Sequence, residues 1–383
     1  MANLEIDDTI TNEIVGNRDR FMKYKILFLG LGESYGGVEQ FIFSICNSFL
    51  KDYFEFGFLN YYEIDDKTQN EINKIGAMEY RVSRYSKNPI RFLKEIYQFY
   101  HTNDEYKVIY CNASHASVIL YAFPIWMNKG KKIVFHSHSS DGNHKRLHLK
   151  LQRLVNKFCT VKLACSEEAG LWMYGNLKNV QIIHNGIDTE RFKFRSITRD
   201  RLRKKYNLQG RLVIGHVGRL SKVKNHDLLL SVFKEILKRK SNAFLVLIGE
   251  GELYKEIKSK ILEMDLEKYV LMIPFQENIE DYYQLMDIFV LPSIREALPF
   301  TGIEAQASGL PVFYSDGVPK EADITDLVHY IKLKEEATIW AEKILQTERP
   351  DRSGYWEEVA KAGFDRKLMV NKVFDILTEN RGN

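Results

Sequence analysis

Two glutamates, Glu296 and Glu304, lie on either side of a predicted strand-to-helix turn. The apolar run 288–292 predicts a buried strand, and Pro299 and Gly309 bound a short helix. Ligands of open α/β sheets bind beyond the carboxyl ends of the strands, so both carboxylates are expected to face a ligand. The first helical turn offers an anion site, and a carboxylate can accept two hydrogen bonds from a sugar diol. The pattern suits a ligand with two sugars joined by phosphates.

A more ordinary role is open to the same residues. Thr301-x-x-Glu304 matches a capping box, in which the glutamate serves only to fix the start of a helix. Glu296 would then be a solvated loop residue. These residues alone leave both interpretations open.

Two cations occupy a comparable place earlier in the chain. The apolar run 212–217 predicts a strand, and Asn225 is a good N-cap for a helix that ends near Arg239. Arg219 and Lys224 lie in the loop between them. Two cations and a helix N-terminus would bind a diphosphate and stabilise it as a leaving group. The alternative is a pair of ordinary surface cations.

Two histidines, His136 and His138, lie on one face of a predicted strand, because side chains in a strand repeat every two residues. His-x-His on a strand is a common metal pair, and Asp141, His144 and His148 follow closely, so a metal-dependent hydrolase is one interpretation. No acidic residue stands at ligand spacing in a second motif. The other interpretation is a hydrogen-bonded pair at a strand end.

Strands and helices alternate in two successive series along the 383 residues, which is enough chain for two domains. The first series begins with the apolar run 25–29 and a turn that contains Gly36 and Gly37. Such a turn lets the backbone approach a phosphate or a sugar. The second series begins at 212–217. The expected fold class is therefore α/β, with two parallel sheets.

The glutamate motif resembles the signature of a known family. Glu296 and Glu304, followed by the small and apolar residues Ala305-x-Ala307-x-Gly309-x-Pro311-Val312, are similar to the motif of retaining GT-B glycosyltransferases of family 4. The resemblance covers roughly residues 23–377 and includes Gly218-Arg219 with Lys224. It implies two Rossmann-like domains that face a central cleft, with the last helix crossing back to the N-terminal domain. The implied boundaries are a polar extension over 1–22, an acceptor-binding domain over 23–186 completed by 358–383, and a donor-binding domain over 187–357.

The resemblance also implies a role for particular residues. Glu304 would hold the ribose of a nucleotide sugar, Glu296 would position the transferred sugar, and His138 would lie near the reacting face. Arg219 and Lys224 would neutralise the departing diphosphate, so that no metal or other cofactor is expected. The implied catalytic residues are His138, Arg219, Lys224 and Glu296. The other implied donor-binding residues are Gly36, Gly37, Gly218, Gly249, Phe275, Gln276, Ala297, Leu298, Pro299, Phe300, Thr301 and Glu304.

The implied reaction moves a hexose from a nucleotide diphosphate sugar, with a uridine nucleotide expected before a guanosine one. The implied acceptor is a lipid-linked glycan of bacterial exopolysaccharide or capsule synthesis. A nucleotide-binding protein without transferase activity is the remaining alternative. Ala297 and Gln306 depart from the family pattern and are expected to affect donor preference.

Composition and charge set further bounds. A formal net charge of +4 gives no argument for nucleic acid as a partner. Cys46, Cys111, Cys159 and Cys165 show no zinc spacing and are expected to be reduced thiols of a cytoplasmic protein. The first 20 residues are polar and acidic, unlike a signal peptide.

A basic helix is predicted over 143–158. One face carries cations without an acid among them: Lys145, Arg146, Lys150, Arg153 and Lys157. A solvated surface helix is the default interpretation of such a pattern. The functional alternative is peripheral contact of the 144–157 helix with anionic lipid at the inner face of the cell membrane.

Overall fold

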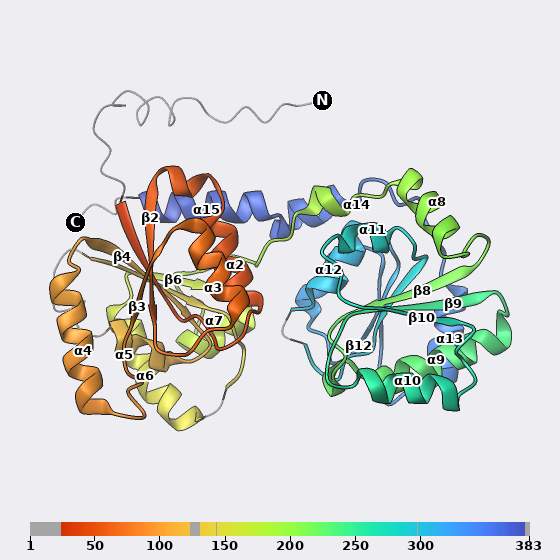
Figure 1. Ribbon diagram of the computed structural model, residues 1–383, viewed down its shortest axis with the longest axis horizontal. Helices are drawn as coiled ribbons and strands as arrows, with labels where there is room; N and C mark the ends of the chain where they lie inside the picture. The colour runs from red at the N-terminus through yellow and green to blue at the C-terminus, as the bar shows by residue number, and fades with distance from the viewer. Residues whose placement is uncertain (1–23, 123–130, 143, 297, 380–383) are drawn as a thin grey trace. The chain divides into compact units, whose positions relative to one another are not determined.

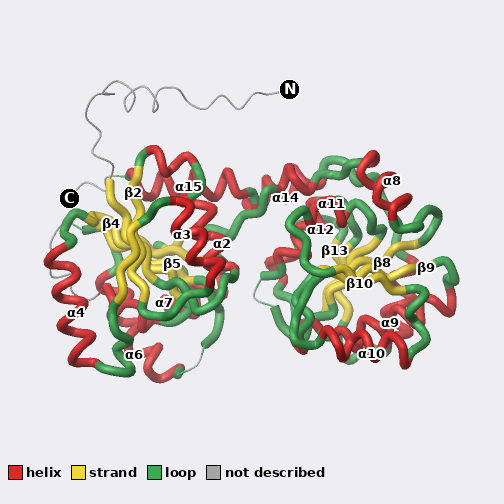
Figure 2. The backbone as a smooth tube through the Cα atoms, in the orientation of Figure 1, coloured by secondary structure: helices red, strands yellow, loops and turns green. Residues whose placement is uncertain are grey.

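The computed structural model describes residues 24–122, 131–142, 144–296 and 298–379. The predicted extension over 1–22 and Ala297 lie outside the described residues. The chain divides into two compact units, each with its own parallel sheet. Unit 1 is Met1–Asn185 with Val370–Asn383, and unit 2 is Gly186–Met369. Figures 1 and 2 show one sheet, with helices around it, in each unit.

Unit 1 alternates strands and helices along the chain. Its strands are β1 (Tyr24–Leu29), β2 (Phe54–Asn60), β3 (Met78–Arg81), β4 (Tyr106–Ala113), β5 (Lys132–Ser137), β6 (Val161–Ala164) and β7 (Val180–Ile182). Its helical segments are α2 (Gly37–Cys46), η1 (Phe49–Asp52), α3 (Asp66–Ile75), α4 (Pro89–Thr102), η2 (Ala116–Val118), α5 (Ile119–Ala122), α6 (Lys145–Phe158) and α7 (Glu167–Tyr174). Local signals explain their starts: Asp65, Asn88 and Ser166 each accept a backbone N–H in the first turn of the helix that follows.

The sheet of unit 1 has the order β3-β2-β1-β4-β5-β6-β7, and every pairing is parallel. The strand order therefore reverses between β1 and β4, which makes their carboxyl ends the expected ligand crevice. Gly30 stands at that point with φ +96°, and a Cβ there would lie 1.8 Å from the carbonyl oxygen of Asn112. Only glycine allows this close approach of the two strands.

Unit 2 repeats the pattern. Its strands are β8 (Leu212–Val217), β9 (Ala243–Ile248), β10 (Val270–Ile273), β11 (Ile288–Leu291), β12 (Val312–Ser315) and β13 (Val328–Ile331). Its helical segments are η4 (Thr189–Phe192), α8 (Ser196–Lys205), η5 (Lys222–Lys224), α9 (His226–Arg239), α10 (Tyr254–Glu263), α11 (Ile279–Tyr283), α12 (Phe300–Ala307), η6 (Lys320–Ala322), α13 (Ala337–Gln346), α14 (Tyr355–Val359) and η7 (Ala360–Phe364). The sheet order is β10-β9-β8-β11-β12-β13, so the reversal lies between β8 and β11.

The four inner strands of unit 2, β8, β9, β11 and β12, are buried on both faces, as parallel strands between helical layers must be. Neighbouring residues therefore enter different cores. Val213 and Phe289 belong to one hydrophobic cluster, and Ile214 and Val290 belong to the cluster on the other face. This two-sided burial accounts for the continuous apolar runs that predict the strands, and the α/β fold class with two parallel sheets is confirmed.

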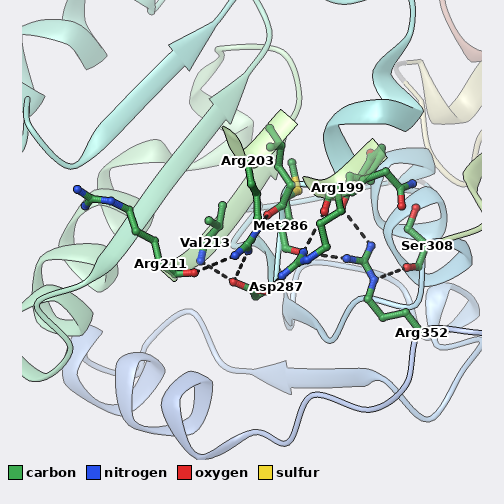
Figure 3. Close-up of polar contacts among 11 residues, drawn as sticks. Arg199, Arg203, Arg211, Val213, Met286, Asp287, Ser308 and Arg352 are labelled. Atoms are coloured by element: carbon green, nitrogen blue, oxygen red, sulfur yellow. Dashed lines mark hydrogen bonds and ion pairs between the residues drawn. The ribbon is translucent and has the colours of Figure 1, made fainter. Parts of the chain in front are cut away.

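A polar cluster holds together the amino ends of β8 and β11, at the edge of the unit 2 sheet opposite its carboxyl ends (Figure 3). Asp287 pairs with Arg199 and, at 2.6 Å, with Arg203, and it accepts the N–H of Val213 at 2.8 Å. Burial acts to raise the pKa of the Asp287 carboxyl, but Arg203 and Arg199 together hold it below its ordinary value. Arg352 donates to three backbone carbonyls, among them that of Ser308 at 2.8 Å. These contacts hold the strand starts and leave the carboxyl ends free for a ligand.

The last helix, α15 (Arg366–Thr378), begins in unit 2 and ends in unit 1. In unit 1 its Phe374 packs against the rings of Phe49, Tyr53 and Phe54, with ring centroids 5.3–6.3 Å apart. In the part of the chain that the structure describes, no helix has both the length and the apolar character needed to cross a bilayer.

One local prediction needs correction. Asn225 stands at the start of α9, but it has φ +55° and its side chain makes no cap hydrogen bond. The tight turn after η5 uses the tolerance of asparagine for the left-handed region instead.

Candidate functional site

Two loops of unit 2 meet where the strand order reverses. One follows β8 and carries Lys224, and the other follows β11 and carries Glu296. The Lys224 ammonium lies 2.6 Å from Glu296 Oε1, and the two side chains are only 16% and 13% exposed. Backbone contacts fix the same junction, because the Ile294 N–H donates to the Val223 carbonyl at 2.7 Å. The structure thus brings together two of the four predicted catalytic residues.

Glycines let a third loop approach this junction. Gly249, after β9, has φ +144°, and a Cβ there would lie 2.0 Å from the Gly218 carbonyl oxygen. The Leu220 N–H donates to the Glu250 carbonyl at 2.8 Å, which joins the two loops. A Cβ at Gly218 would lie 3.2 Å from Lys224 Cε, so the glycine leaves room for the lysine stem. The close packing explains why glycine is required at 249.

Arg219 differs from Lys224 in its surroundings. Its side chain is 75% exposed and pairs loosely with Glu252 at 3.3 Å. An exposed pair of this kind contributes little to stability and is easily exchanged. Arg219 is therefore free to turn toward an anion, whereas Lys224 already has a buried partner.

The start of α12 offers backbone donors without a side-chain cap. Pro299 is the N-cap residue, no side chain caps the helix, and its first turn has no acidic residue. Leu298, Phe300 and Thr301 are partly exposed, and Pro299 is buried. Because the positive end of the helix is unoccupied among the described residues, it suits an anion. Gly302 lets α12 pack closely against Tyr314, because a Cβ at position 302 would lie 2.1 Å from the tyrosine hydroxyl.

Glu304 is not part of a capping box. Its Oε2 lies 2.7 Å from the hydroxyl of Tyr283, at the end of α11, and that hydroxyl is also 3.0 Å from the Thr301 carbonyl. The Thr301 hydroxyl is buried and makes no hydrogen bond among the described residues. The helix-start interpretation of Glu304 is therefore wrong, and the carboxylate is held from outside its own helix.

The electrostatics of Glu304 are unusual for a carboxylate. Burial raises the pKa of Glu304 to about 7, against the hydrogen bond from Tyr283 and the charge of Arg191, which both lower it. Arg191 itself pairs with Glu280 at 2.8 Å, so its charge is shared. New hydrogen-bond donors, such as the hydroxyls of a diol, would stabilise the ionised form of this carboxyl and lower its pKa.

Phe275 and Gln276 follow β10 at the same edge of the sheet. Phe275 is 61% exposed, and its N–H donates to Glu250 Oε1 at 3.3 Å. Gln276 Oε1 accepts a hydrogen bond from the Tyr282 hydroxyl at 2.8 Å. The exposed ring of Phe275 leaves a flat apolar surface on which a planar base would stack.

Gln306 corrects an expectation about donor preference. Its side chain is fully buried, and its amide nitrogen donates to the Ala322 carbonyl at 2.8 Å and to the Tyr314 hydroxyl at 3.1 Å. Its oxygen accepts the N–H groups of Ile324 and Thr325. Gln306 thus holds the loop after β12 in place and does not face the site.

In unit 1 the glycine turn is closed by a residue that the sequence reasoning missed. The carboxylate of Glu39 accepts the N–H groups of Gly32 and Gly36, each at 2.8 Å, and the side chain is 3% exposed. The Glu39 carboxylate therefore occupies the N-terminal end of α2. Gly36 and Gly37 shape this turn, but the N–H of Gly36 is already used.

The two histidines lie on and directly after β5, the neighbour of β4 in the sheet of unit 1. His138 Nε2 is 3.0 Å from Asn112 Oδ1, while His136 Nδ1 is 3.1 Å from the Tyr110 hydroxyl. Burial lowers the pKa of His138 to about 3, so its ring is neutral at ordinary pH. Because the Asn112 amide nitrogen faces the Leu29 carbonyl, its oxygen faces His138, which makes Nε2 the donor and leaves Nδ1 as an acceptor.

The remaining members of the suspected metal set lie elsewhere. His148 is buried, with its Nε2 2.9 Å from the Trp172 carbonyl, and its ring stacks on that tryptophan at 3.8 Å. Asp141 pairs with Lys145 at 3.5 Å. Within the described ranges, no three histidine, cysteine or acidic side chains gather closely enough to hold a metal ion. The pattern of His136 and His138 is that of two hydrogen-bonded neutral rings.

The basic helix forms as α6. Lys145, Arg146, Lys150, Arg153 and Lys157 are all exposed. The opposite face buries His148, Leu151 and Val155 against the sheet. All four cysteines are free thiols.

The sequence matches known families in both units. Residues 35–191 match the family model described as Glycosyltransferase Family 4, and residues 198–348 match the one described as Glycosyl transferases group 1. EpsF of Bacillus subtilis (strain 168), which is named as a glycosyltransferase, is 30% identical over 378 residues, covering 94% of this chain and 98% of EpsF.

Two further relatives add detail. The UDP-Gal:alpha-D-GlcNAc-diphosphoundecaprenol alpha-1,3-galactosyltransferase of Escherichia coli is 30% identical over 168 residues, which is 41% of this chain and 43% of that protein. The structure of Anabaena Alr3699/HepE in complex with UDP superimposes with a TM-score of 0.74 at 18% identity, covering 92% of this chain and 99% of that one. The two Rossmann-like units and these structural neighbours confirm the predicted GT-B fold.

Proposed function

Because the chain belongs to the glycosyltransferases of group 1 and family 4, we propose that it transfers a hexose from a uridine diphosphate sugar to a lipid-linked glycan, with retention of configuration. Support for the donor comes from the Anabaena neighbour, which was solved with UDP, and from the Escherichia coli relative, whose name includes UDP-Gal. Support for the acceptor comes from the diphosphoundecaprenol in that same name. The proposed setting is exopolysaccharide or capsule synthesis in the cytoplasm.

One observation carries the proposal. At the strand reversal of unit 2, the Lys224–Glu296 pair, the uncapped start of α12 and the poised carboxyl of Glu304 lie on one edge of one sheet. This order supplies a sugar contact, an anion site and a diol contact. A nucleotide diphosphate sugar has these three parts in the same order.

In the proposed reaction, a hydroxyl oxygen of the acceptor forms a bond to the anomeric carbon as the bond from that carbon to the diphosphate breaks. The proton of the acceptor hydroxyl passes to an oxygen of the departing diphosphate. Lys224, Arg219 and the α12 start would stabilise the charge that develops there, in place of a metal ion. Glu304 would hold the ribose, and Phe275 would stack on the base. His138, whose Nδ1 has no hydrogen-bond partner among the described residues, would accept a hydrogen bond there from a hydroxyl of the substrate.

The membrane contact proposed for this protein uses the exposed cations of α6. Anionic lipid attracts each such cation by about 1 kcal/mol. Neutralising Lys145, Arg146, Lys150 and Arg153 together should therefore abolish binding to phosphatidylglycerol vesicles. Unchanged vesicle binding would remove this contact from the proposal.

Calorimetry tests the donor assignment. UDP, GDP and ADP are titrated into wild type and Glu304→Ala with a chelator present. We expect UDP to bind most tightly, and the variant to lose about 1.5–3 kcal/mol for each charge-assisted hydrogen bond removed. UDP binding that Glu304→Ala leaves unchanged would overturn the ribose contact. Absence of any nucleotide binding would overturn the function.

A further inference from the structure

A cavity of about 780 Å³ opens in unit 1, and none of its lining residues is among the site residues that the sequence singled out. Its walls are the loops that follow β1, β2 and β3, together with the start of α4. These loops all leave the carboxyl edge of the parallel sheet, on which the ligands of such sheets bind. The cavity lies beside the reversal between β1 and β4, because the loop after β1 contributes Glu33 to it.

One wall of the cavity is suited to a phosphate. α4 is 14 residues long and has no acidic residue in its first turn, and its N-cap Asn88 accepts the N–H of Arg91 at 3.0 Å. Lys87 and Arg91 line the cavity beside this helix start, and Arg91 is paired with Glu95 at 2.6 Å. The Lys87 ammonium is exposed and has no hydrogen bond or ion pair within the described ranges. Arg84 adds a third cation, whose pairing with Glu33 is long at 3.6 Å.

The other wall is suited to a sugar. Tyr61 and Tyr62 present two rings with centroids 4.8 Å apart, and the Arg84 guanidinium lies over the Tyr62 ring at 4.3 Å. Asn60 is 2% exposed and belongs to the cavity lining, and its buried Oδ1 accepts no hydrogen bond from any of the described residues. A buried acceptor of this kind normally has a partner, and a sugar hydroxyl would supply one. Glu63 is a further acceptor on this side.

An apolar stripe on α4 begins at the mouth of the cavity. Ile90, Leu93 and Tyr97 are 82%, 55% and 67% exposed, although Phe92 and Ile96 on the other face are buried. The spacing of the exposed residues places them along one face of the helix. In Figure 1, α4 runs along one side of unit 1. An apolar face bordered by Lys87, Arg91 and Lys94 has the composition of a helix that lies on a lipid surface.

We propose that this cavity binds the phosphate-bearing sugar of a lipid-linked acceptor. The phosphate lies at Lys87, Arg84 and the start of α4, the sugar lies over Tyr61 and Tyr62, and the lipid continues along the apolar stripe. The inference rests on the proposed transferase function, and it adds the group of the acceptor that is recognised and the residues that recognise it. The carboxylate of Asp65 takes no part, since it already accepts the N–H groups of Tyr35 and Thr68.

The first arm of the test measures the phosphate site. Pyrophosphate is titrated by calorimetry into protein saturated with UDP, so that the nucleotide site is already filled. We expect binding in wild type and a loss of roughly tenfold or more in Lys87→Ala, because one charge-assisted contact is removed. Lys94→Ala is the matched control, since Lys94 lies on the same helix but does not line the cavity. Equal binding by all three proteins would overturn the proposal.

The second arm tests the lipid. Sedimentation is measured with phosphatidylcholine vesicles that contain a small fraction of a polyprenyl diphosphate, so that little anionic charge is available to α6. Ile90→Ser should lose this binding, whereas Ile197→Ser, at a residue 84% exposed in unit 2, should retain it. Equal binding by both variants, with pyrophosphate binding intact, would assign the cavity to a free sugar phosphate and overturn the lipid assignment.

UDP affinity, measured in every variant, separates this inference from the proposed function. The substituted side chains belong to unit 1, or to the far surface of unit 2, and none is placed in the donor site. A wild-type protein that binds no UDP defeats the proposed function. Normal UDP binding together with unaltered pyrophosphate binding in Lys87→Ala defeats only the inference about the cavity.

Discussion

Acidification should weaken nucleotide binding through the carboxyl of Glu304. Burial places the pKa of Glu304 at about 7 in the ligand-free protein. Ribose hydroxyls donate to the ionised form, so they bind the deprotonated carboxylate in preference. With that pKa, the ionised fraction falls from about 90% at pH ~8 to about 10% at pH ~6. The affinity for UDP should therefore fall roughly tenfold over this range because of Glu304 alone.

Tyr283 should set the pH at which the affinity for UDP falls. Its hydroxyl, 2.7 Å from Glu304 Oε2, lowers the pKa of the carboxyl. In Tyr283→Phe the pKa of Glu304 should rise further, and the loss of UDP affinity should begin at a higher pH. At neutral pH the variant should bind UDP more weakly, although its own ring touches no part of the proposed ligand.

The assay is calorimetry with UDP at a series of pH values, on wild type, Tyr283→Phe and Glu304→Gln. UDP itself takes up a proton near pH ~6, and Glu304→Gln retains only that part of the dependence. The difference between wild type and Glu304→Gln isolates the carboxyl. If the two proteins show the same pH dependence, Glu304 does not titrate against the nucleotide, and the reasoning fails.

The free energy of unfolding of the nucleotide-free protein should also depend on pH through Glu304. Because the folded-state pKa of Glu304 is raised, the folded protein holds this proton more tightly than the unfolded chain does. The stabilising contribution of Glu304 is therefore complete below about pH 4.5 and is lost as the pH rises through about 7. Thermal unfolding of wild type relative to Glu304→Gln should show this decline.

Two further predictions concern the framework of unit 2. Asp287→Asn should lower the free energy of unfolding by about 3–5 kcal/mol in urea, because it leaves the buried Arg203 and the partly buried Arg199 without their carboxylate. The control Asp281→Asn, at a residue with the more exposed partners Arg195 and Arg201, should cost less than about 1 kcal/mol. Gly249→Ala should reduce both UDP affinity and melting temperature, since its Cβ would meet the Gly218 carbonyl, whereas Gly210→Ala, with open space around it, should lower only the melting temperature slightly. Normal UDP affinity in Gly249→Ala would show that the turn at Gly249 does not shape the nucleotide site.

The sequence predicts the edge of the sheet on which the loop residues of unit 2 lie, for a physical reason. Parallel strands buried on both faces give unbroken apolar runs, and the residues just after such runs must lie at one edge of the sheet. Glu296, Lys224 and Gly249 could be placed there from sequence alone. Their mutual distances could not, because which strands are neighbours depends on the sheet order, and β8 adjoins β11 although two strands separate them in the chain.

The residues that were missed act on others from a distant part of the chain. Tyr283 ends α11 and reaches Glu304 across 20 intervening residues, and no local pattern marks a tyrosine as the partner of a glutamate. Glu39 is different, because a glutamate three residues after Gly36 is the local pattern of a capping box and could have been recognised. The cavity beside α4 had no such signal, since its walls come from three loops and a helix start.

The contact between Lys224 and Glu296 leads to the last prediction. Both groups are largely buried, and at 2.6 Å each compensates the charge of the other while the site is without ligand. A diphosphate that binds at Lys224 must compete with Glu296 for the ammonium, and this exchange releases Glu296 to accept hydroxyls of the donor sugar. Glu296→Gln should therefore bind UDP, which has no sugar to hold, at least as tightly as wild type does.

The same variant should transfer sugar more slowly, because the amide holds the hydroxyls less strongly than a carboxylate. A loss of roughly tenfold or more in kcat is expected from one charge-assisted contact. Lys224→Met should instead lose UDP affinity and kcat together, since it removes the cation itself and leaves Glu296 buried without a partner. UDP affinity that falls in Glu296→Gln as far as in Lys224→Met would show that the two residues act only as a structural pair, and the exchange of partners would be refuted.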